Sequence, residues 1–357
     1  MSQLHTPLQI GSVQLPNRIF MAPLTRMRAF EQRSVGDLQV EHYRQRATAG
    51  LILTEATSVC PMGVGYPNTP GIWSAQQVAG WKRVTDAVHA AGGHIAVQLW
   101  HVGRISDPEL LDGQLPVAPS AIAAEGDVSV LRPKRPYAVP RALETAEIAG
   151  IVQDFVQAAR NAKEAGFDFI EVHAANGYLF DQFLHEGSNQ RTDQYGGSIE
   201  NRARFLLETV DALLKEWPAE RIGVHLNPMS NTHSMSDSNP VALFTYVAEQ
   251  LQARKLGFIF SREELKDGVL PIGQHMRQVF KGVFIANDGF TAEQAQAVVA
   301  SGAADAVAFG RAFIANPDLP ERIAKGAAWN ELNASTIYSP DATGYNDYPT
   351  LEQLQAK

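Results

Sequence analysis

Short apolar runs of strand length alternate along the chain with longer stretches in which apolar residues recur at helical spacing. Several of the short runs are apolar at every position, as in parallel strands that are buried on both faces. The strand-like runs cover residues 19–24, 51–56, 94–100, 167–172, 221–227, 258–261, 283–287 and 306–309. The helix-like stretches cover residues 37–48, 75–91, 145–166, 200–216, 240–254, 273–280, 291–301 and 319–324.

Eight strand signals separated by helical segments predict an α/β fold, a closed (β/α)8 barrel of the TIM type. Two alternating runs within residues 8–16 predict a hairpin before the barrel. Residues 103–140, after the third strand, are irregular and rich in proline, which predicts an inserted loop or hairpin. An open, doubly wound sheet is the weaker alternative, because no Gly-x-Gly-x-x-Gly follows any strand. No stretch resembles a linker, so residues 1–357 are interpreted as a single domain.

The composition is that of an ordinary globular protein, with 45% hydrophobic and 19% charged residues among 357. Lys and Arg number 30 against 38 Asp and Glu, a net charge of −8, so neither nucleic acid nor an anionic membrane is an expected partner. The single cysteine, Cys60, excludes an intramolecular disulfide and fits a reducing compartment. No signal peptide and no apolar run of about 20 residues is found. We therefore expect a cytoplasmic protein.

The strand-like run 167–172 ends at three hydrogen-bonding side chains, His173, Asn176 and Tyr178. Imidazole, carboxamide and phenol groups without a carboxylate or thiol are poor metal ligands, so no metal site is expected. They are well suited to hold a carbonyl or nitro oxygen that gains negative charge, with a weak acid beside it. Taken alone, the same residues also fit a core histidine, a turn asparagine and a buried tyrosine.

Polar residues follow the other predicted strands as well, at the face where active sites of this fold lie. Asp288-Gly289 and Gly310-Arg311 follow the last two strands, where barrels of this kind often bind phosphate. Gln98 can pair with an imide edge, and Trp100 is an aromatic neighbour. Phosphate, imide and aromatic groups together suggest bound FMN. The remaining strand-end residues include Pro23, Leu24, Thr25, Arg26, Glu55, Ala56, His225, Asn227 and Arg262.

Long motifs distributed over residues 4–350 resemble the signatures of the Old Yellow Enzyme family. The subgroup that the chain resembles most is the bacterial N-ethylmaleimide reductase and pentaerythritol tetranitrate reductase type. Thr25 supports this subgroup, since the thermophilic-like branch of the family carries cysteine there. The motifs are MAPLTRMR (21–28), YRQRA (43–47), GLILTEA (50–56), QLWHVGR (98–104), HAANGYL (173–179), NQRTDQYGGSIENR (189–202), FGRAFIANPDL (309–319) and GYNDYP (344–349).

The resemblance implies a flavin ene reductase with tightly but non-covalently bound FMN, reduced by NADPH or NADH. Its substrates would be electron-poor alkenes, such as α,β-unsaturated carbonyls and maleimides, or nitro compounds. His173 and Asn176 would hold the substrate oxygen while hydride passes from flavin N5 to the β carbon, and Tyr178 would give a proton to the α carbon. The substrate side would be lined by Tyr66, Trp100 and Tyr338. A monomer is expected, with a dimer as the alternative.

The resemblance also implies which residues contact the flavin. Thr25 would donate a hydrogen bond to the C4 carbonyl and tune the potential, and Gln98 would pair with the pyrimidine edge. The backbone contacts would come from Pro23, Leu24 and Ala56, and the phosphate contacts from the turn at Asp288-Gly289 and from Gly310 and Arg311.

Position 225 departs from the family pattern. Family members usually carry arginine in a VRLSP-like string, where it faces flavin N1 and the C2 carbonyl, whereas this chain reads VHLNP (224–228). Arginine is always charged, but histidine is shorter and titrates near neutral pH. We therefore predict a less stabilised reduced flavin, and a His225→Arg variant with a higher midpoint potential. The alternative is that a water or another side chain compensates for the missing arginine at position 225.

Two other functions fit parts of the pattern. A flavin-free barrel lyase or isomerase could use Arg311 to hold the phosphate of its substrate. A flavin-binding protein with little turnover is the other alternative, which the retained His173, Asn176, Tyr178 and Thr25 disfavour.

Overall fold

Eight parallel strands form a closed barrel in this computed structural model, which describes residues 3–229 and 231–356. Strand β4 pairs with both β3 and β6 and so closes the ring, while β5 (Thr57–Ser58) pairs alongside β6 as an additional strand. The predicted (β/α)8 barrel is confirmed, and the open-sheet alternative is wrong. The barrel strands are β3 (Ile19–Met21), β4 (Ile52–Leu53), β6 (Ile95–Trp100), β9 (Phe169–Ala174), β10 (Ile222–Leu226), β11 (Phe258–Arg262), β12 (Val283–Asn287) and β13 (Ala306–Phe309).

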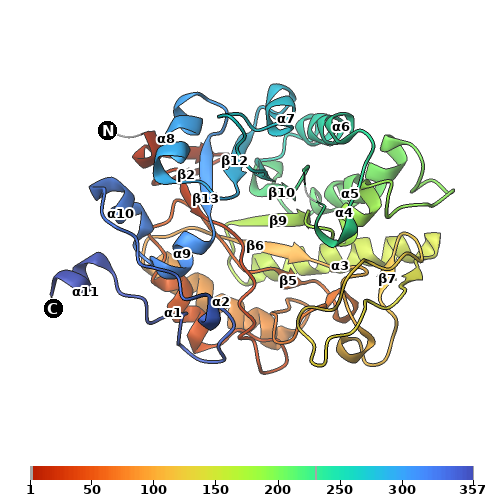
Figure 1. Ribbon diagram of the computed structural model, residues 1–357, viewed down its shortest axis with the longest axis horizontal. Coiled ribbons are helices and arrows are strands. Elements are labelled where there is room, and N and C mark those ends of the chain that lie inside the picture. The colour runs from red at the N-terminus through yellow and green to blue at the C-terminus, as the bar shows by residue number, and fades with distance from the viewer. Residues whose placement is uncertain (1–2, 230, 357) are drawn as a thin grey trace.

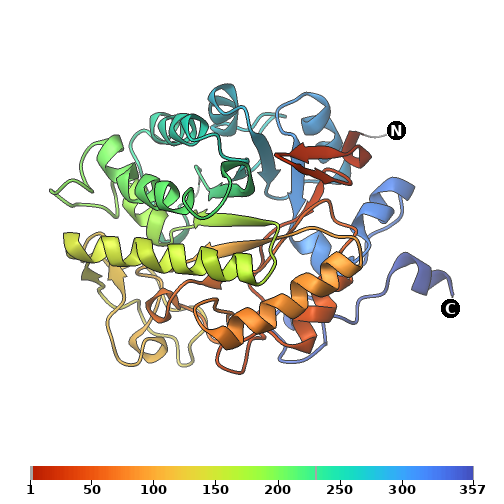
Figure 2. The same ribbon diagram turned by 180° about the vertical axis from the view of Figure 1, so that it is seen from behind.

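Helices surround the barrel, with α6, α7 and α8 on one side of the strands and α1, α2 and α3 on the other (Figures 1 and 2). Each starts within one residue of where the sequence predicts, and α2 begins with a capping box between Ser74 and Gln77. None of the helices in the described ranges is both long and apolar enough to cross a membrane. The bounds are α1 (Asp37–Arg44), α2 (Ala75–Ala90), α3 (Thr145–Glu164), α5 (Ile199–Leu213), α6 (Pro240–Ala253), α7 (Gly273–Val279), α8 (Ala292–Ala300) and α10 (Leu319–Lys325).

Three short α-helices of the described residues were not predicted. Helix α4 (Leu179–Leu184) occupies part of what the sequence indicated as a polar loop, and α9 (Arg311–Ala315) and α11 (Leu351–Gln355) are also new. Their lengths of five or six residues are too short for a helical period to be visible in the sequence. Helix α1 is shorter than predicted and ends at Arg44.

The amino-terminal hairpin closes one end of the barrel. Its strands β1 (Leu8–Ile10) and β2 (Val13–Leu15) are antiparallel, as predicted. Their buried side chains pack against Phe20, Phe169 and Phe258 of the barrel strands. Burying such side chains stabilises the fold by roughly 1.5–3 kcal/mol each. This end of the barrel is thus filled with apolar groups, and polar side chains gather at the other end.

Side chains of β9 alternate between the barrel interior and the surrounding helices. Phe169 belongs to the interior cluster with the hairpin, whereas Ile170 and Val172 belong to the outer core. Because successive side chains of a strand point to opposite faces, Glu171 and His173 point into the barrel with Phe169. This alternation brings polar groups to the carboxyl-terminal mouth of the barrel.

The predicted insertion leaves the barrel after β6 and packs over its mouth. Its short strands β7 (Val117–Ala118) and β8 (Arg141–Ala142) pair in parallel, so they are not the two arms of a hairpin. An antiparallel bridge between Asp127 and Pro136 gives the tip of the insertion a hairpin-like turn. Apolar residues of the insertion pack against Trp100, which fixes the insertion to the barrel.

Candidate functional site

Two stacked histidines lie at the mouth of the barrel. His173 of β9 and His225 of β10 are paired in register, and their rings are 5.0 Å apart and inclined by 9°. Both are buried, and burial lowers the pKa of His173 to about 3. The pKa of His225 is also lowered well below its usual value, chiefly by burial. Both rings are therefore neutral at pH 7.

Gln98 links His225 to a buried carboxyl group. Its Nε2 donates to Glu171 Oε2 at 2.6 Å and lies 3.0 Å from His225 Nδ1. The amide N–H requires Nδ1 to accept, so the ring proton of His225 is on Nε2, which has no partner among the described residues. Burial raises the pKa of Glu171 to about 8, so its carboxyl group is mostly protonated at pH 7. The layer beneath the mouth is thus polar but uncharged.

Asn176 is held with its amide nitrogen turned away from the neighbouring protein donors. Its backbone is left-handed, with φ 57°, which asparagine tolerates better than most residues. Its Oδ1 accepts from Asn227 Nδ2 at 2.5 Å and from Arg262 Nη1 at 3.2 Å. Because two donors occupy the oxygen, the Nδ2 group remains available as a donor. Asn176 thus keeps a free amide donor three residues after His173 in the loop that follows β9.

An aromatic box stands beside these donors. Tyr178 lies edge-on to His173 and Trp100, with ring centroids 5.1 Å and 4.9 Å away. Its hydroxyl is 2.9 Å from that of Tyr66, whose ring stacks on Trp100. Burial, followed by the neighbouring Tyr66, raises the pKa of Tyr178 well above its usual value. The phenol therefore keeps its proton and can act as a weak acid.

A segment near the carboxyl terminus brings Tyr338 to this box. Arg26 and Arg28, in the first predicted motif, donate to backbone carbonyls between residues 336 and 344. Both guanidinium groups also lie over the ring of Tyr345, at 4.8 Å and 4.3 Å. Tyr338 is 57% exposed and close enough to contribute to the raised pKa of Tyr178. The two arginines thus position one wall of the site.

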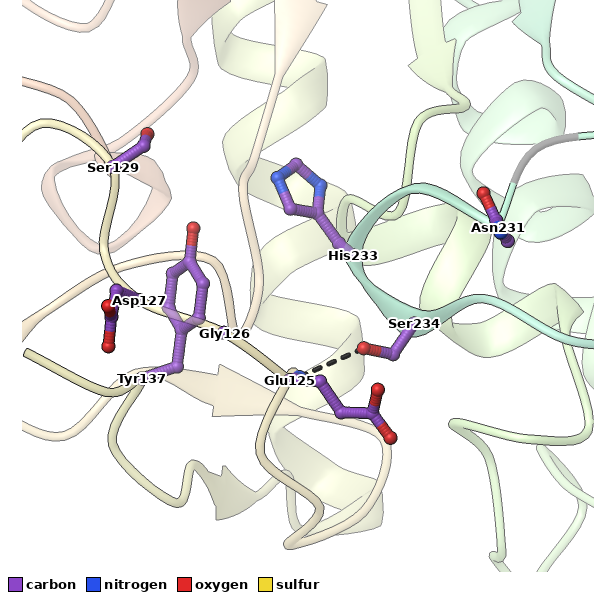
Figure 3. A pocket seen from close by; sticks show the side chains of 8 residues that line it. All are labelled: Glu125, Gly126, Asp127, Ser129, Tyr137, Asn231, His233 and Ser234. Carbon is purple, nitrogen blue, oxygen red and sulfur yellow. Dashed lines mark hydrogen bonds between the residues drawn. The ribbon is translucent and has the colours of Figure 1, made fainter.

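A cavity of about 660 Å³ opens beside Tyr178, between the insertion and the segment that follows β10. Tyr137 lies on one wall and His233 on the other (Figure 3). The His233 ring is 5.3 Å from that of Tyr178, and its Nδ1 is 2.7 Å from the backbone oxygen of Asn176. Glu125 N donates to Ser234 Oγ, which joins the two walls. His173, Asn176 and Tyr178 are not among the residues that line it, so the cavity adjoins the predicted site and does not contain it.

The residues predicted to hold a flavin lie around the mouth, with one complication. Pro23, Leu24 and Thr25 follow β3 and are partly exposed, Ala56 is buried, and a Cβ on Gly310 would be 3.4 Å from Leu24. Arg311 is exposed at the start of α9. Gly289 has φ +72° in an open turn, but Asp288 beside it has φ 118°, a backbone region favoured by glycine. The predicted phosphate turn therefore carries a strained residue with a carboxylate.

Several residues that shape the site were not assigned a role from the sequence. Arg262 and Asn227 were noted only as strand-end residues, although both hold Asn176. Glu171 could have been found from the alternation of β9, because it lies between Phe169 and His173 on the same face. No group of three His, Cys, Asp or Glu side chains in ranges 3–229 and 231–356 could hold a metal ion.

Comparison with known proteins agrees with this geometry. The family model of the NADH:flavin oxidoreductase / NADH oxidase family matches residues 3–330. A putative 12-oxophytodienoate reductase 4 of Oryza sativa subsp. japonica is 44% identical over 98% of this chain and 93% of its own length. The 12-oxophytodienoate reductase 2 of Arabidopsis thaliana is 43% identical over 98% of this chain and 96% of its own.

Solved structures show the same fold. Morphinone reductase in complex with tetrahydroNAD has a TM-score of 0.94 and 52% identity, covering 98% of each chain. The Old Yellow Enzyme homologue of Zymomonas mobilis has a TM-score of 0.94 and 41% identity, covering 98% of this chain and 100% of its own. The chain therefore belongs to the Old Yellow Enzyme family of NADH:flavin oxidoreductases, whose members are NAD(P)H-dependent flavin enzymes.

Proposed function

We propose that the protein is an FMN-dependent ene reductase. It would accept electrons from NADH or NADPH and reduce the C=C bond of α,β-unsaturated carbonyls and maleimides, and also nitro compounds. The observation that carries this proposal is the neutral ring of His173 beside the phenol of Tyr178, with the amide of Asn176 oriented by Asn227 so that its nitrogen can donate. Family membership favours this activity over the flavin-free lyase or isomerase.

The residues at the mouth fit a flavin. The N–H groups of His225 and Trp100 are buried without a hydrogen-bond partner among the described residues, and a polar ring edge could satisfy such groups. Gln98 and Thr25 would hold the flavin ring, while Gly310 and Arg311 would hold the phosphate. The carboxylate of Asp288 opposes a phosphate, but Arg262 Nε lies 3.5 Å from it and offsets part of its charge.

In the proposed reaction, bound FMN supplies the hydride. His173 and Asn176 donate hydrogen bonds to the substrate oxygen, which draws electron density from the double bond toward that oxygen. Tyr178 donates its proton to the α carbon from the opposite side, and the Tyr66 hydroxyl holds the phenol in place. Trp100 and Tyr338 bound the space in which the alkene lies.

The visible spectrum under anaerobic conditions tests the proposal. A bound-flavin spectrum should bleach with NADH or NADPH and return when 2-cyclohexenone is added. Bleaching without return would contradict alkene reduction while leaving the flavin assignment in place. A colourless protein that takes up no added FMN would contradict the cofactor itself.

A further inference from the structure

We propose that Arg262 supplies the positive charge at the barrel mouth that His225 does not carry, and that this charge stabilises the reduced flavin. The inference rests on the proposed function, because it concerns the same flavin. Arg262 is thereby a positioning and electrostatic residue, and its charge replaces that of the arginine that family members usually carry at position 225.

His225 is held in its neutral form by its surroundings. Its side chain is only 5% exposed, and it lies against Phe260 with ring centroids 4.4 Å apart. Its Nδ1 accepts from Gln98, and the nearest carboxyl oxygen, Glu171 Oε2, is 4.0 Å away on a group that is itself mostly protonated at pH 7. An imidazolium here would be desolvated without a charged partner, which is unfavourable.

Arg262 reaches the mouth from the neighbouring strand. Phe258 and Phe260 belong to the interior cluster, so Arg262, two residues further along β11, points to the same face. Its Nη1 lies 3.2 Å from Oδ1 of Asn176, which follows β9. Strand β10 lies between β9 and β11. The guanidinium therefore extends over the end of the strand that carries His225.

The surrounding groups do not cancel this charge. Asp288 is the carboxylate paired with Arg262, at 3.5 Å, and both side chains are about 40% exposed, at 43% and 39%. Water screens such a pair, so it is weaker than a buried one. On the interior side, the charge of Arg262 contributes to the lowered pKa of both His173 and His225. Arg262 is thus a cation that acts on the layer of the site facing the flavin.

A cation at this place acts on the redox equilibrium. A flavin gains negative charge on reduction, so a nearby positive charge stabilises the reduced form more than the oxidised form. The difference raises the midpoint potential, and it also favours the anionic over the protonated reduced flavin. These two effects distinguish a charge from a merely structural contact with Asn176.

Spectroelectrochemistry of the FMN-loaded enzyme and its variants tests the inference. Arg262→Gln should weaken the binding of reduced FMN relative to oxidised FMN at least tenfold. For a two-electron couple, a tenfold change lowers the midpoint potential by about 30 mV. The same variant should also have a higher pKa for the reduced flavin, because the neutral form is then favoured over the anion. Arg262→Lys should retain most of both properties. Arg254→Gln, which removes a partly buried arginine paired with Asp211 on the outer helices, is the matched control and should leave both unchanged.

His225→Arg is a second variant that keeps Arg262. Because Arg262 already supplies the charge, the inference favours compensation by another side chain over the higher midpoint potential predicted from the sequence for His225→Arg. We expect the ratio of reduced to oxidised FMN affinity to change less than threefold in His225→Arg. The same substitution should change this ratio more when Arg262→Gln is also present. The inference would be overturned if His225→Arg alone raised the ratio of reduced to oxidised FMN affinity tenfold. It would also be overturned if Arg262→Gln left the midpoint potential unchanged. Wild-type protein that binds no FMN would instead contradict the proposed function.

Discussion

Tyr178 is the residue that we propose as the proton donor of the site. Its phenol retains its proton because burial and Tyr66 raise its pKa, and it faces both His173 and Trp100. Replacing Tyr178 by Phe should slow alkene reduction by roughly 100-fold or more, the contribution of a positioned general acid. Stopped-flow measurement of the two half-reactions should show flavin reduction within about twofold of the wild type.

Tyr66→Phe is the control for this experiment. It removes the hydroxyl that lies 2.9 Å from the Tyr178 hydroxyl but leaves the proton donor. We therefore expect a smaller loss, of roughly tenfold or less, confined to alkene reduction. Equal losses in both half-reactions for Tyr178→Phe would show that Tyr178 is not the proton donor.

Asp288 affects the site in two ways, through its strained backbone and through the charge of its carboxylate. At φ 118° its Cβ is strained, and its carboxylate lies in the turn proposed to hold phosphate. Asp288→Gly should raise the free energy of unfolding by about 1 kcal/mol after the added backbone entropy of glycine is subtracted. It should also tighten FMN binding up to about fivefold, the effect of one exposed charge.

Asp288→Asn separates the two contributions, because it removes the charge and keeps the Cβ. Thermal unfolding and fluorescence titration with FMN should show tighter FMN binding without the full gain in stability. Weaker FMN binding in both variants would mean that Asp288 orders Arg262 more than it repels the phosphate.

At the scale of elements, Arg28 holds the carboxyl-terminal segment against the barrel. Its guanidinium donates to backbone oxygens of Arg26, Thr336, Ile337, Asp341 and Thr343. Hydrogen bonds to charged groups contribute roughly 1.5–3 kcal/mol each, so Arg28→Met should release this segment locally. Hydrogen exchange between residues 336 and 345 should become faster, while the barrel strands stay protected.

Arg44→Met is the matched control, because Arg44 forms an exposed ion pair with Glu41 at 2.7 Å. Exposed pairs of this kind contribute little, so exchange in the 336–345 segment should not change. If Arg28→Met accelerated exchange throughout the barrel, the arginine would stabilise the whole fold rather than the segment.

The elements that the sequence predicts well are those with a local signal. Continuous apolar runs revealed the barrel strands, and His173, Asn176 and Tyr178 could be placed because they follow one such run directly. The contacts of Arg262 with Asn176 were not predictable, since they depend on the register of three neighbouring strands. The strain at Asp288 was also hidden, because an Asn-Asp-Gly turn ordinarily places the positive φ at the glycine alone.

At the scale of the whole molecule, buried carboxyl groups set how stability depends on pH. Burial raises the pKa of Glu171 from 4.5 to about 8, and that of Glu55 from 4.5 to about 7. For each group, between pH 4.5 and the raised pKa, the unfolded chain has lost a proton that the folded protein still binds. The free energy of unfolding therefore falls as pH rises through this range, and the contribution of each group approaches about 1.4 kcal/mol per pH unit.

Glu171→Gln should remove one of these contributions, because the amide oxygen can still accept from Gln98 but no longer titrates. Relative to the wild type, the variant should gain stability steadily from pH 5 to about pH 8, where the carboxyl group of the folded protein ionises. Denaturant unfolding of the flavin-loaded enzyme at several pH values measures this difference. Glu55→Gln is the internal comparison, since its gain should level off near pH 7 instead. A stability difference between Glu171→Gln and wild type that does not change with pH would show that Glu171 ionises normally, and the layer beneath the flavin would then carry a negative charge facing Arg262.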